Sequence, residues 1–247
     1  MRLSRLSVTL IRLRVYKLLF ILSRRYWRRA LIKEGVGAAV EHRFLKSFYI
    51  DTLVDIGANR GQFSLALRPF VSGQVYAFEP IPCVVDKLRR VFSSDCSVEI
   101  FDLAVANDKG ECVLELSASD DSSSLLPISD EQHRLYPGTY KVGEVKVKTV
   151  RLDDILSPDD ISGVALLKVD VQGAELQTLN GCASLLPSFD YVYCECSMRE
   201  LYEGQALAGE IIAFLWNQGF HLTDIRNVSR IDGDFVQADF LFEKIKR

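Results

Sequence analysis

A glycine-punctuated turn between two short apolar segments constrains the fold of this chain more than any other feature. Residues 53–63 read LVDIGANRGQF and contain the pattern D-x-G-x-x-x-G, and residues 75–80 read VYAFEP. The apolar residues before the first glycine predict a strand, whereas those after the turn recur at a spacing closer to that of a helix than to strict alternation. The stretch is therefore predicted to form a β-turn-α-β unit, and such units bind nucleosides at the turn.

The glycines and acids of this unit indicate which nucleoside it binds. Gly57 and Gly61 lack a Cβ, so a ligand can lie against the main chain, and the helix that begins near Gly61 directs unpaired N–H groups to the same place. Glu79 ends the second strand, where it can accept hydrogen bonds from both ribose hydroxyls. Asp55 would repel a pyrophosphate but suits an ammonium group, and the G-x-G-x-x-G pattern of dinucleotide folds is missing. Alone, the pattern fits any turn between strand and helix, but together with the acid-ended second strand it favours S-adenosyl-L-methionine.

Strand-like and helix-like segments alternate along the rest of the chain. Helices are predicted at 84–92, 175–186 and 206–218, and strands at 98–103, 165–171 and 191–196, with a closing strand pair at 220–225 and 235–243. This alternation predicts an α/β fold with a mostly parallel sheet and helices on both faces. Ligands in such folds lie beyond the carboxyl ends of the strands.

The alternation breaks between residues 107 and 154. Two strands, at 112–116 and 144–150, flank a polar segment that contains two prolines. A loop of that length inside a compact domain is usually functional or disordered. The insertion is predicted to be a lid on the substrate side, and a solvated connector is the alternative.

The amino-terminal arm, residues 1–33, differs from the remainder in charge. It holds ten Lys or Arg residues and no acid, which leaves 20 basic against 33 acidic residues in the domain predicted at 34–247. Charged residues interrupt the apolar ones, so the arm contains no uncharged stretch long enough to cross a bilayer. It also lacks a signal-peptide cleavage site. Two interpretations of the arm remain. Residues 1–30 form an interfacial helix on anionic lipid, or the arm forms a helix that packs on its own domain or on a dimer mate.

These features predict a cytoplasmic protein, with peripheral contact at the inner face of the membrane as one alternative. Nucleic acid is not expected as a partner because the domain is acidic. The six cysteines form no C-x-x-C pair and no cluster with histidine, so neither a metal site nor a disulfide framework is expected. No feature of the sequence indicates an oligomeric state.

Candidate catalytic residues follow the apolar strand at 165–171. Alternation places Lys168 and Asp170 on one face, and a turn at Gly173 leads to Glu175. Methyl transfer to a hydroxyl needs a base, and a carboxylate can act as one, with Asp170 as the first candidate. A structural pair of Lys168 with Asp170 is the alternative. Glu195 is a second candidate for the base or for a contact with a substrate hydroxyl.

Two further polar residues are weaker candidates. His133 lies in the predicted lid and could be the base after closure, although lone histidines are more often structural or solvated. Asp102 ends the third predicted strand, where it could accept a hydrogen bond from an adenine amino group. A solvated loop aspartate is the alternative for Asp102.

Several motifs in this order resemble the FkbM family of S-adenosyl-L-methionine-dependent methyltransferases. They are VDIGANRGQFS, VYAFEP, VKVKTVRLDDI, LLKVDVQGAELQTLNG and YCECS, within residues 35–243, together with the serines at 122–124 and LYEG at 201–204. The resemblance implies a class I, Rossmann-like methyltransferase fold, which has seven strands, and O-methylation. Gln172 stands where many relatives carry glutamate, which argues against a metal-dependent variant.

The resemblance also completes the set of predicted site residues. The predicted donor contacts are Asp55, Gly57, Asn59, Gly61, Glu79, Pro80, Asp102 and Ala104, and the predicted acceptor contacts are Ser124 and Glu175. The predicted function is O-methylation of a sugar hydroxyl in a glycan or glycolipid. A small secondary metabolite as acceptor and a non-catalytic nucleotide-binding protein are the alternatives.

Overall fold

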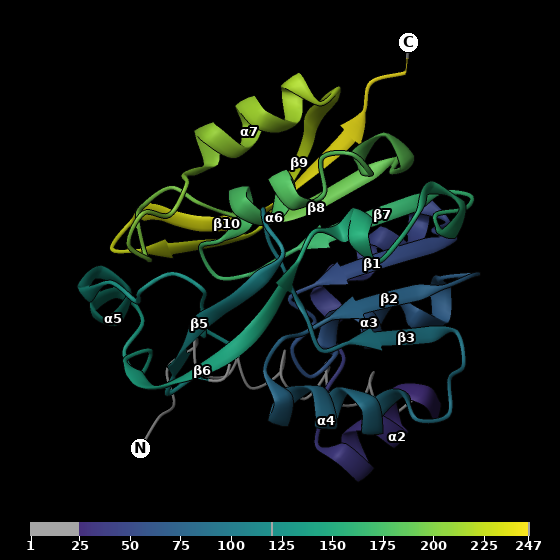
Figure 1. Cartoon of the computed structure of the whole chain (residues 1–247), viewed down its shortest axis with the longest axis horizontal. Coiled ribbons are helices and arrows are strands. Elements are labelled where there is room, and N and C mark those ends of the chain that lie inside the picture. Colours follow the sequence, from purple (N-terminus) through teal and green to yellow (C-terminus); the bar gives the residue numbers. More distant parts are fainter. Residues whose placement is uncertain (1–24, 120, 247) are drawn as a thin grey trace, which may run out of the picture.

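A computed structural model describes residues 25–119 and 121–246, which form an α/β domain around a seven-stranded sheet (Figure 1). The strand order is β3-β2-β1-β7-β8-β10-β9. The first five strands in this order are parallel, and β10 and β9 close the sheet antiparallel. The strands are β1 (Thr52–Ile56), β2 (Val75–Phe78), β3 (Val98–Phe101), β7 (Ala165–Val169), β8 (Tyr191–Ser197), β9 (Phe220–Ile231) and β10 (Asp234–Lys244). The predicted mostly parallel sheet is confirmed.

Helices cover both faces of the sheet. One face carries α3 (Gln62–Leu67), α4 (Pro82–Phe92) and the 3-10 helix η1 (Val40–Phe48), and the other carries α6 (Glu175–Gly181) and α7 (Ala208–Asn217). A hydrophobic core lies on each face of the sheet, and strand β1 contributes to both. Leu53 packs with η1 and α3, whereas Val54 packs on the opposite face. Near-continuous apolar strands are typical of a sheet buried on both faces. Short 3-10 turns complete the domain: η2 (Arg68–Phe70), η3 (Leu152–Asp154), η4 (Pro158–Asp160) and η5 (Leu186–Ser188).

The helix predicted at 175–186 is shorter than expected. It ends at Gly181, where a Cβ would lie 2.1 Å from the carbonyl oxygen of Ala106. The 3-10 turn η5 follows with Pro187 inside it. Proline lacks a backbone N–H and cannot continue an α-helix.

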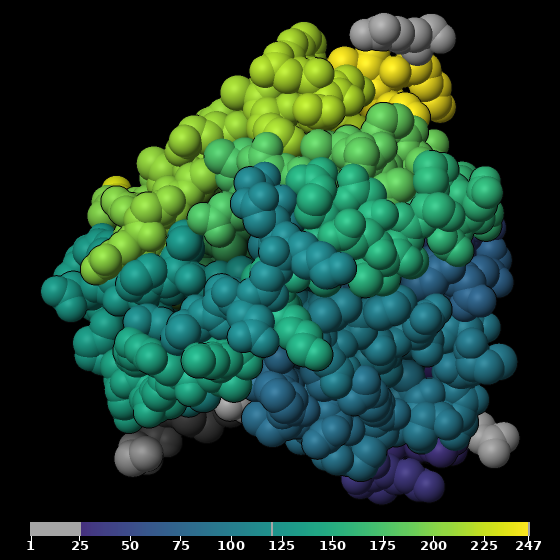
Figure 2. All heavy atoms as spheres, in the orientation of Figure 1, coloured from purple at the N-terminus to yellow at the C-terminus, as the bar shows by residue number. Residues whose placement is uncertain are grey.

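The insertion forms a second, three-stranded sheet beside the carboxyl ends of the parallel strands (Figure 1). It consists of β4 (Ala104–Val105), β5 (Gly110–Ser117) and β6 (Lys141–Val150), in the order β4-β6-β5. The predicted strand pair is present and longer than expected. Figure 2 shows the insertion forming one continuous surface with the first half of the domain.

The polar segment of the insertion is built into the fold. It contains α5 (Asp130–Leu135), which begins where the Ser129 hydroxyl accepts a hydrogen bond from the Gln132 backbone N–H. The buried polar residues of this segment include Ser122, Ser124, Gln132 and Thr139. Its predicted role as a lid stays a prediction.

The end of the basic arm belongs to the folded domain. Residues Arg25–Glu34 form α2, which crosses the boundary predicted at 33/34. Trp27 is fully buried against α3 and α4, and its Nε1 donates a hydrogen bond to the Leu65 carbonyl at 2.7 Å. Residues 1–24 lie outside the described residues, so the predicted membrane contact stays a prediction. Within 25–119 and 121–246, none of the helices has the length and apolar character needed to cross a bilayer.

Candidate active site

A cavity lies at the carboxyl ends of β1, β2, β7 and β8. Its walls come from the turns after β1, β2 and β7, from η1, from β8 and β10, and from the insertion. The lining side chains that bear on the chemistry are His42, Asn59, Glu79, Asp121, Lys168, Asp170, Gln172, Tyr193, Glu195 and Asp239. The position agrees with the expectation that ligands of such folds lie beyond the strand ends.

Five of the predicted donor contacts line this cavity: Gly57, Asn59, Glu79, Pro80 and Ala104. The two oxygens of Glu79 accept hydrogen bonds from the backbone N–H groups of Asn59 and Ile81, both at 2.9 Å. Burial raises the pKa of Glu79 to about 7. A buried carboxyl group at a strand end, beside apolar walls from β2 and the insertion, fits the ribose and base of a nucleoside.

Three predicted donor contacts do not line the cavity. Asp55 is fully buried, where it accepts a hydrogen bond from the Ser64 hydroxyl at 2.6 Å. Asp102 lies on the surface and pairs with the Arg89 guanidinium at 3.0 Å. A Cβ on Gly61 would lie 2.6 and 2.7 Å from side-chain atoms of α4, so this glycine allows α3 and α4 to pack closely.

Gly57 has the same kind of role as Gly61, although it also lines the cavity. Its φ is +75°, and a Cβ there would lie 1.8 Å from the backbone oxygen of Asp170. The neighbouring turn of the protein by itself requires glycine at this position. Protein atoms pack closely at both glycines, and the predicted close approach of a ligand stays a prediction.

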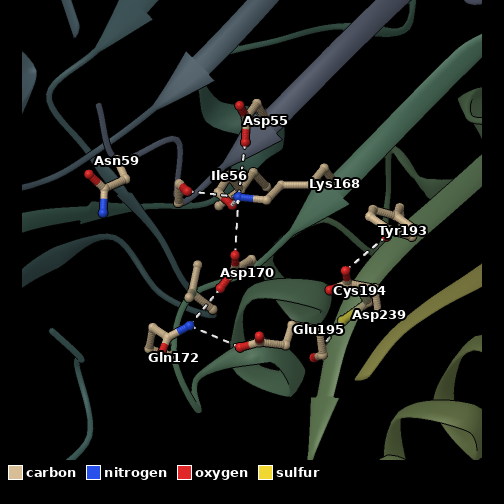
Figure 3. Close-up of polar contacts among 12 residues, drawn as sticks. Asp55, Ile56, Asn59, Lys168, Asp170, Gln172, Tyr193, Cys194, Glu195 and Asp239 are labelled. Atoms are coloured by element: carbon tan, nitrogen blue, oxygen red, sulfur yellow. Dashed lines mark hydrogen bonds and ion pairs between the residues drawn. The ribbon is translucent and has the colours of Figure 1, made fainter. Parts of the chain in front are cut away.

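Lys168 connects the turn after β1 with the turn after β7 (Figure 3). Its Nζ donates a hydrogen bond to the Gly57 carbonyl at 2.7 Å and lies 3.1 Å from Asp55 Oδ1 and 3.8 Å from Asp170 Oδ2. Strand register explains the nearer pair, because Asp55 and Lys168 are opposite residues of β1 and β7. Burial lowers the pKa of Lys168, but the two carboxylates outweigh this and raise it overall, so the amine stays charged.

Gln172 bridges the two candidate catalytic acids (Figure 3). Its Nε2 donates to Asp170 Oδ1 at 2.8 Å and to Glu195 Oε2 at 2.9 Å. The Tyr202 hydroxyl donates to Gln172 Oε1 at 2.9 Å, which fixes the orientation of the amide. Burial, and then the charge of Asp170, raise the pKa of Glu195 well above its usual range. The sequence identified Gln172 only as a departure from glutamate, and its bridging role was missed.

Two residues at the cavity have backbone angles that are uncommon outside glycine. Asn59 has a φ of +49° and Gln172 a φ of +55°. Such left-handed conformations are costly for residues with a Cβ and cluster at functional sites. Both lie in the turns that carry the predicted donor and acceptor groups.

The structure does not bring the two predicted acceptor contacts to the cavity. Glu175 is buried and accepts hydrogen bonds from the backbone N–H groups of Val171 and Gly173, so it stabilises the turn before α6. Burial raises the pKa of Glu175 to about 7. Ser124 is buried too, and its hydroxyl donates to the backbone carbonyl of Gln172 at 2.5 Å, which ties the insertion to the turn after β7.

The histidine at the cavity is not the predicted one. His133 is exposed on α5, with its ring against Tyr140. His42, on η1, lines the cavity, and its Nδ1 lies 3.1 Å from the Tyr193 hydroxyl, which donates to Asp239 Oδ2 at 2.9 Å. Burial lowers the pKa of His42. One indication of this group was present in the sequence: Tyr193 lies two residues before Glu195 on the same strand, so the two side chains share a face.

Comparison with known proteins agrees with this architecture. The profile of the methyltransferase FkbM domain matches residues 55–222. The chain is 30% identical over 162 residues to the 2-O-methyltransferase NoeI of Sinorhizobium fredii, a match that covers 62% of this chain and 66% of NoeI. It is 29% identical over 148 residues to the hexuronic acid methyltransferase AglP of Haloferax volcanii, covering 59% of this chain and 55% of AglP.

Solved structures of methyltransferases are similar at low identity. The magnesium protoporphyrin IX methyltransferase ChlM of Synechocystis PCC 6803, solved with bound S-adenosyl-L-methionine, is 11% identical, with 89% of each chain covered and a TM-score of 0.44. The family profile spans more than half of the chain and includes the turns after β1, β2 and β7. The chain therefore belongs to the FkbM family of S-adenosyl-L-methionine-dependent methyltransferases.

Proposed function

We propose that this protein is an O-methyltransferase that methylates a hydroxyl of a sugar in a glycan or glycolipid. The observation that carries the proposal is the group of Lys168, Asp170, Gln172 and Glu195, which faces the same cavity as the buried Glu79. The names of NoeI and AglP, a 2-O-methyltransferase and a hexuronic acid methyltransferase, support a sugar hydroxyl as the acceptor.

The residues that would hold the donor are those of the turns after β1 and β2. Glu79 would accept the ribose hydroxyls, and Gly57, Asn59, Pro80 and Ala104 would line the nucleoside. S-adenosyl-L-methionine supplies an electrophilic methyl group on a sulfonium. Asp55 would act indirectly, because it pairs with the Lys168 ammonium, and this ammonium in turn donates a hydrogen bond to the Gly57 carbonyl.

Asp170 is the proposed base. One of its oxygens accepts the Gln172 amide, and the other lies 3.8 Å from Lys168, so the carboxylate is oriented while its side chain remains 38% exposed toward the cavities. This accessible carboxylate can accept the proton of an acceptor hydroxyl as the methyl group is transferred. Both oxygens of Glu195 already accept amide hydrogens, from Gln172 and from Gln237, which suits a role in orienting the acceptor.

The proposal is tested by calorimetric titration of the full chain with S-adenosylhomocysteine, with NAD as the control, followed by a screen of acceptors. Micromolar binding of S-adenosylhomocysteine alone, with methylation of a glycan in the screen, is the expected result. Methylation of small secondary metabolites with no glycan turned over would move the acceptor to that alternative. Binding of NAD in place of S-adenosylhomocysteine would contradict the proposed donor site.

A further inference from the structure

A second hollow adjoins the cavity at the two candidate catalytic acids, Asp170 and Glu195. It shares four lining residues with the first cavity, namely Asp121, Asp170, Gln172 and Glu195. The rest of its lining comes mainly from the polar segment of the insertion and from Gln237. Its volume is about 550 Å³, which falls in the range of roughly 300–1,000 Å³ that is usual for small-molecule sites. A ligand in this hollow would meet Asp170 without contacting Glu79, which lines only the first cavity.

The hollow is polar and its charged groups are all acids. Its lining contains the carboxyl groups of Asp121, Asp170 and Glu195, and none of its lining residues within the described chain is Lys, Arg or His. The basic residues of the neighbouring segments are already paired: Arg134 and Arg199 contact Glu131, and Lys141 contacts Glu115. Lys168 lines the first cavity and not the hollow, and its ammonium is shared between Asp55 and Asp170. An anionic group in the hollow would therefore meet mainly like charge.

One buried side-chain amide of the hollow has a carbonyl oxygen that accepts no hydrogen bond from the described residues. Gln132 is only 4% exposed, and its Oε1 has no partner among the described residues. The orientation of this amide follows from its neighbour, because the single proton of the Tyr202 hydroxyl is directed to the carbonyl oxygens of Gln172 and Ser122. The hydroxyl oxygen therefore accepts from Gln132 Nε2, at 3.4 Å. A buried carbonyl oxygen without a donor is costly, so a small rotation of the Gln132 side chain that let a ligand hydroxyl or ammonium bond to it would be favoured.

We infer that this hollow is the acceptor subsite and that it selects a sugar that is neutral or carries an ammonium group, and rejects uronic acids and phosphorylated sugars. The inference rests on the proposed function and adds the charge class of the acceptor. Sugar hydroxyls and ammonium groups are donors, which match the acceptors formed by Gln132 Oε1 and by the carboxylates of Asp121 and Asp170. A carboxylate or phosphate brings only further acceptors and negative charge.

The experiment compares matched pairs of acceptors on the full chain saturated with S-adenosylhomocysteine. The probes are the methyl glycosides of glucose, galactose and mannose, each beside its uronic acid, together with methyl glucosaminide. Binding is measured by saturation-transfer NMR and competition, and turnover is measured separately with S-adenosyl-L-methionine. We expect the uronic acid of each pair to bind at least about tenfold more weakly than its neutral partner.

Two variants in the hollow and one control variant test whether the hollow itself causes this preference. Asp121→Lys adds a cation at the junction and should shift the preference toward the uronic acid, whereas Glu99→Lys on the distant edge strand β3 makes the same charge change and should leave the preference as it was. Gln132→Leu should weaken binding of the neutral sugars and leave S-adenosylhomocysteine affinity unchanged.

The outcomes separate the inference from the proposed function. Equal binding of neutral and uronic sugars, or binding of none of them, overturns the inference. Failure of every sugar to be methylated, while neutral sugars still bind in preference to uronic acids, overturns the proposed reaction and leaves the charge selectivity of the hollow supported.

Discussion

Asp170 is the residue at which chemistry and donor binding can be separated. Asp170 lines both the cavity and the hollow proposed for the acceptor, whereas the proposed donor contacts such as Glu79 line only the cavity. Asp170→Asn keeps the size of the side chain and removes the proton acceptor, so kcat should fall by a factor of more than about 100. S-adenosylhomocysteine affinity, measured by calorimetry, should change little, and Asp159→Asn on the surface should change neither. Wild-type turnover in Asp170→Asn would transfer the role of base to Glu195 or His42.

Glu79 should control donor affinity and its pH dependence. Burial raises the pKa of Glu79 to about 7, so its carboxylate form is present above this pH and is lost as the pH falls through it. Donor affinity should therefore fall by up to about tenfold per pH unit below 7. Loss of a charge-assisted hydrogen bond of roughly 1.5–3 kcal/mol in Glu79→Gln should weaken binding about 10- to 150-fold at pH 8 and flatten the profile.

Titration with S-adenosylhomocysteine also tests the position of Asp102, the other acid that the sequence predicted as a donor contact. Asp102→Asn should bind S-adenosylhomocysteine like the wild type, because the Asp102 carboxylate pairs with Arg89 on the surface. A large loss of affinity in Asp102→Asn, or an unchanged pH profile in Glu79→Gln, would contradict these assignments.

The buried pair of Asp55 and Lys168 is a residue-scale determinant of stability. Lys168→Met should lower the free energy of unfolding by about 3–5 kcal/mol, since it leaves the fully buried Asp55 carboxylate without its cation. The double variant Asp55→Asn/Lys168→Met should be more stable than Lys168→Met alone. Urea denaturation of the single and double variants measures both effects, and strict additivity would show that the two side chains are not coupled.

These residue roles show how far the sequence could specify the site. The alternation in 165–171 correctly placed Lys168 beside Asp170, because neighbours two apart on a strand share a face. The nearer partner of Lys168, Asp55, depends on the register between β1 and β7, which no local pattern contains. His42 reaches Tyr193 across 151 positions of the chain, so its place at the cavity arises only from the packing of η1 against the sheet.

At the scale of elements, short apolar segments of the sequence predicted the strands of the main sheet well, whereas the structure of the insertion was predicted poorly. Apolar runs of four to seven residues located the parallel strands because both faces of this sheet are buried. The polar segment of the insertion gave no periodic signal, and α5 is defined by its Ser129 cap and by contacts with distant residues such as Tyr202. A segment whose structure depends on such contacts cannot be read from local composition.

Helix α2 offers a test of how strongly an element from the basic arm is held by the domain. Trp27 is its fully buried anchor. Trp27→Ala should lower the free energy of unfolding by about 3–5 kcal/mol, as expected for removal of a buried large aromatic side chain. Trp216→Ala, on α7, is the matched control, because Trp216 is 60% exposed and its replacement should change stability by no more than about 0.5 kcal/mol. Equal effects in the two variants, measured by urea denaturation, would show that α2 is not docked in solution.

At the scale of the whole molecule, the charge is divided between a basic end and an acidic domain. Residues 1–24 contain six Lys or Arg and no acid, and the structure shows that the arm can be shortened to this point without removing α2 or Trp27. A basic segment near anionic lipid contributes about 1 kcal/mol per Lys or Arg. We therefore expect the full chain to co-sediment with vesicles that contain phosphatidylserine and to be released by salt.

Deletion of residues 1–24 isolates this contribution from folding, because Trp27 and the hydrogen bond from its Nε1 to Leu65 are retained. The shortened chain should lose vesicle binding while it keeps S-adenosylhomocysteine affinity and the wild-type unfolding transition. Vesicles of phosphatidylcholine alone are the control for contact that does not depend on lipid charge. If the shortened and full chains sediment equally with anionic vesicles, the arm does not hold the protein at a membrane. The acidic domain would then have to find its acceptor without help from lipid, since like charge keeps its surface away from an anionic bilayer.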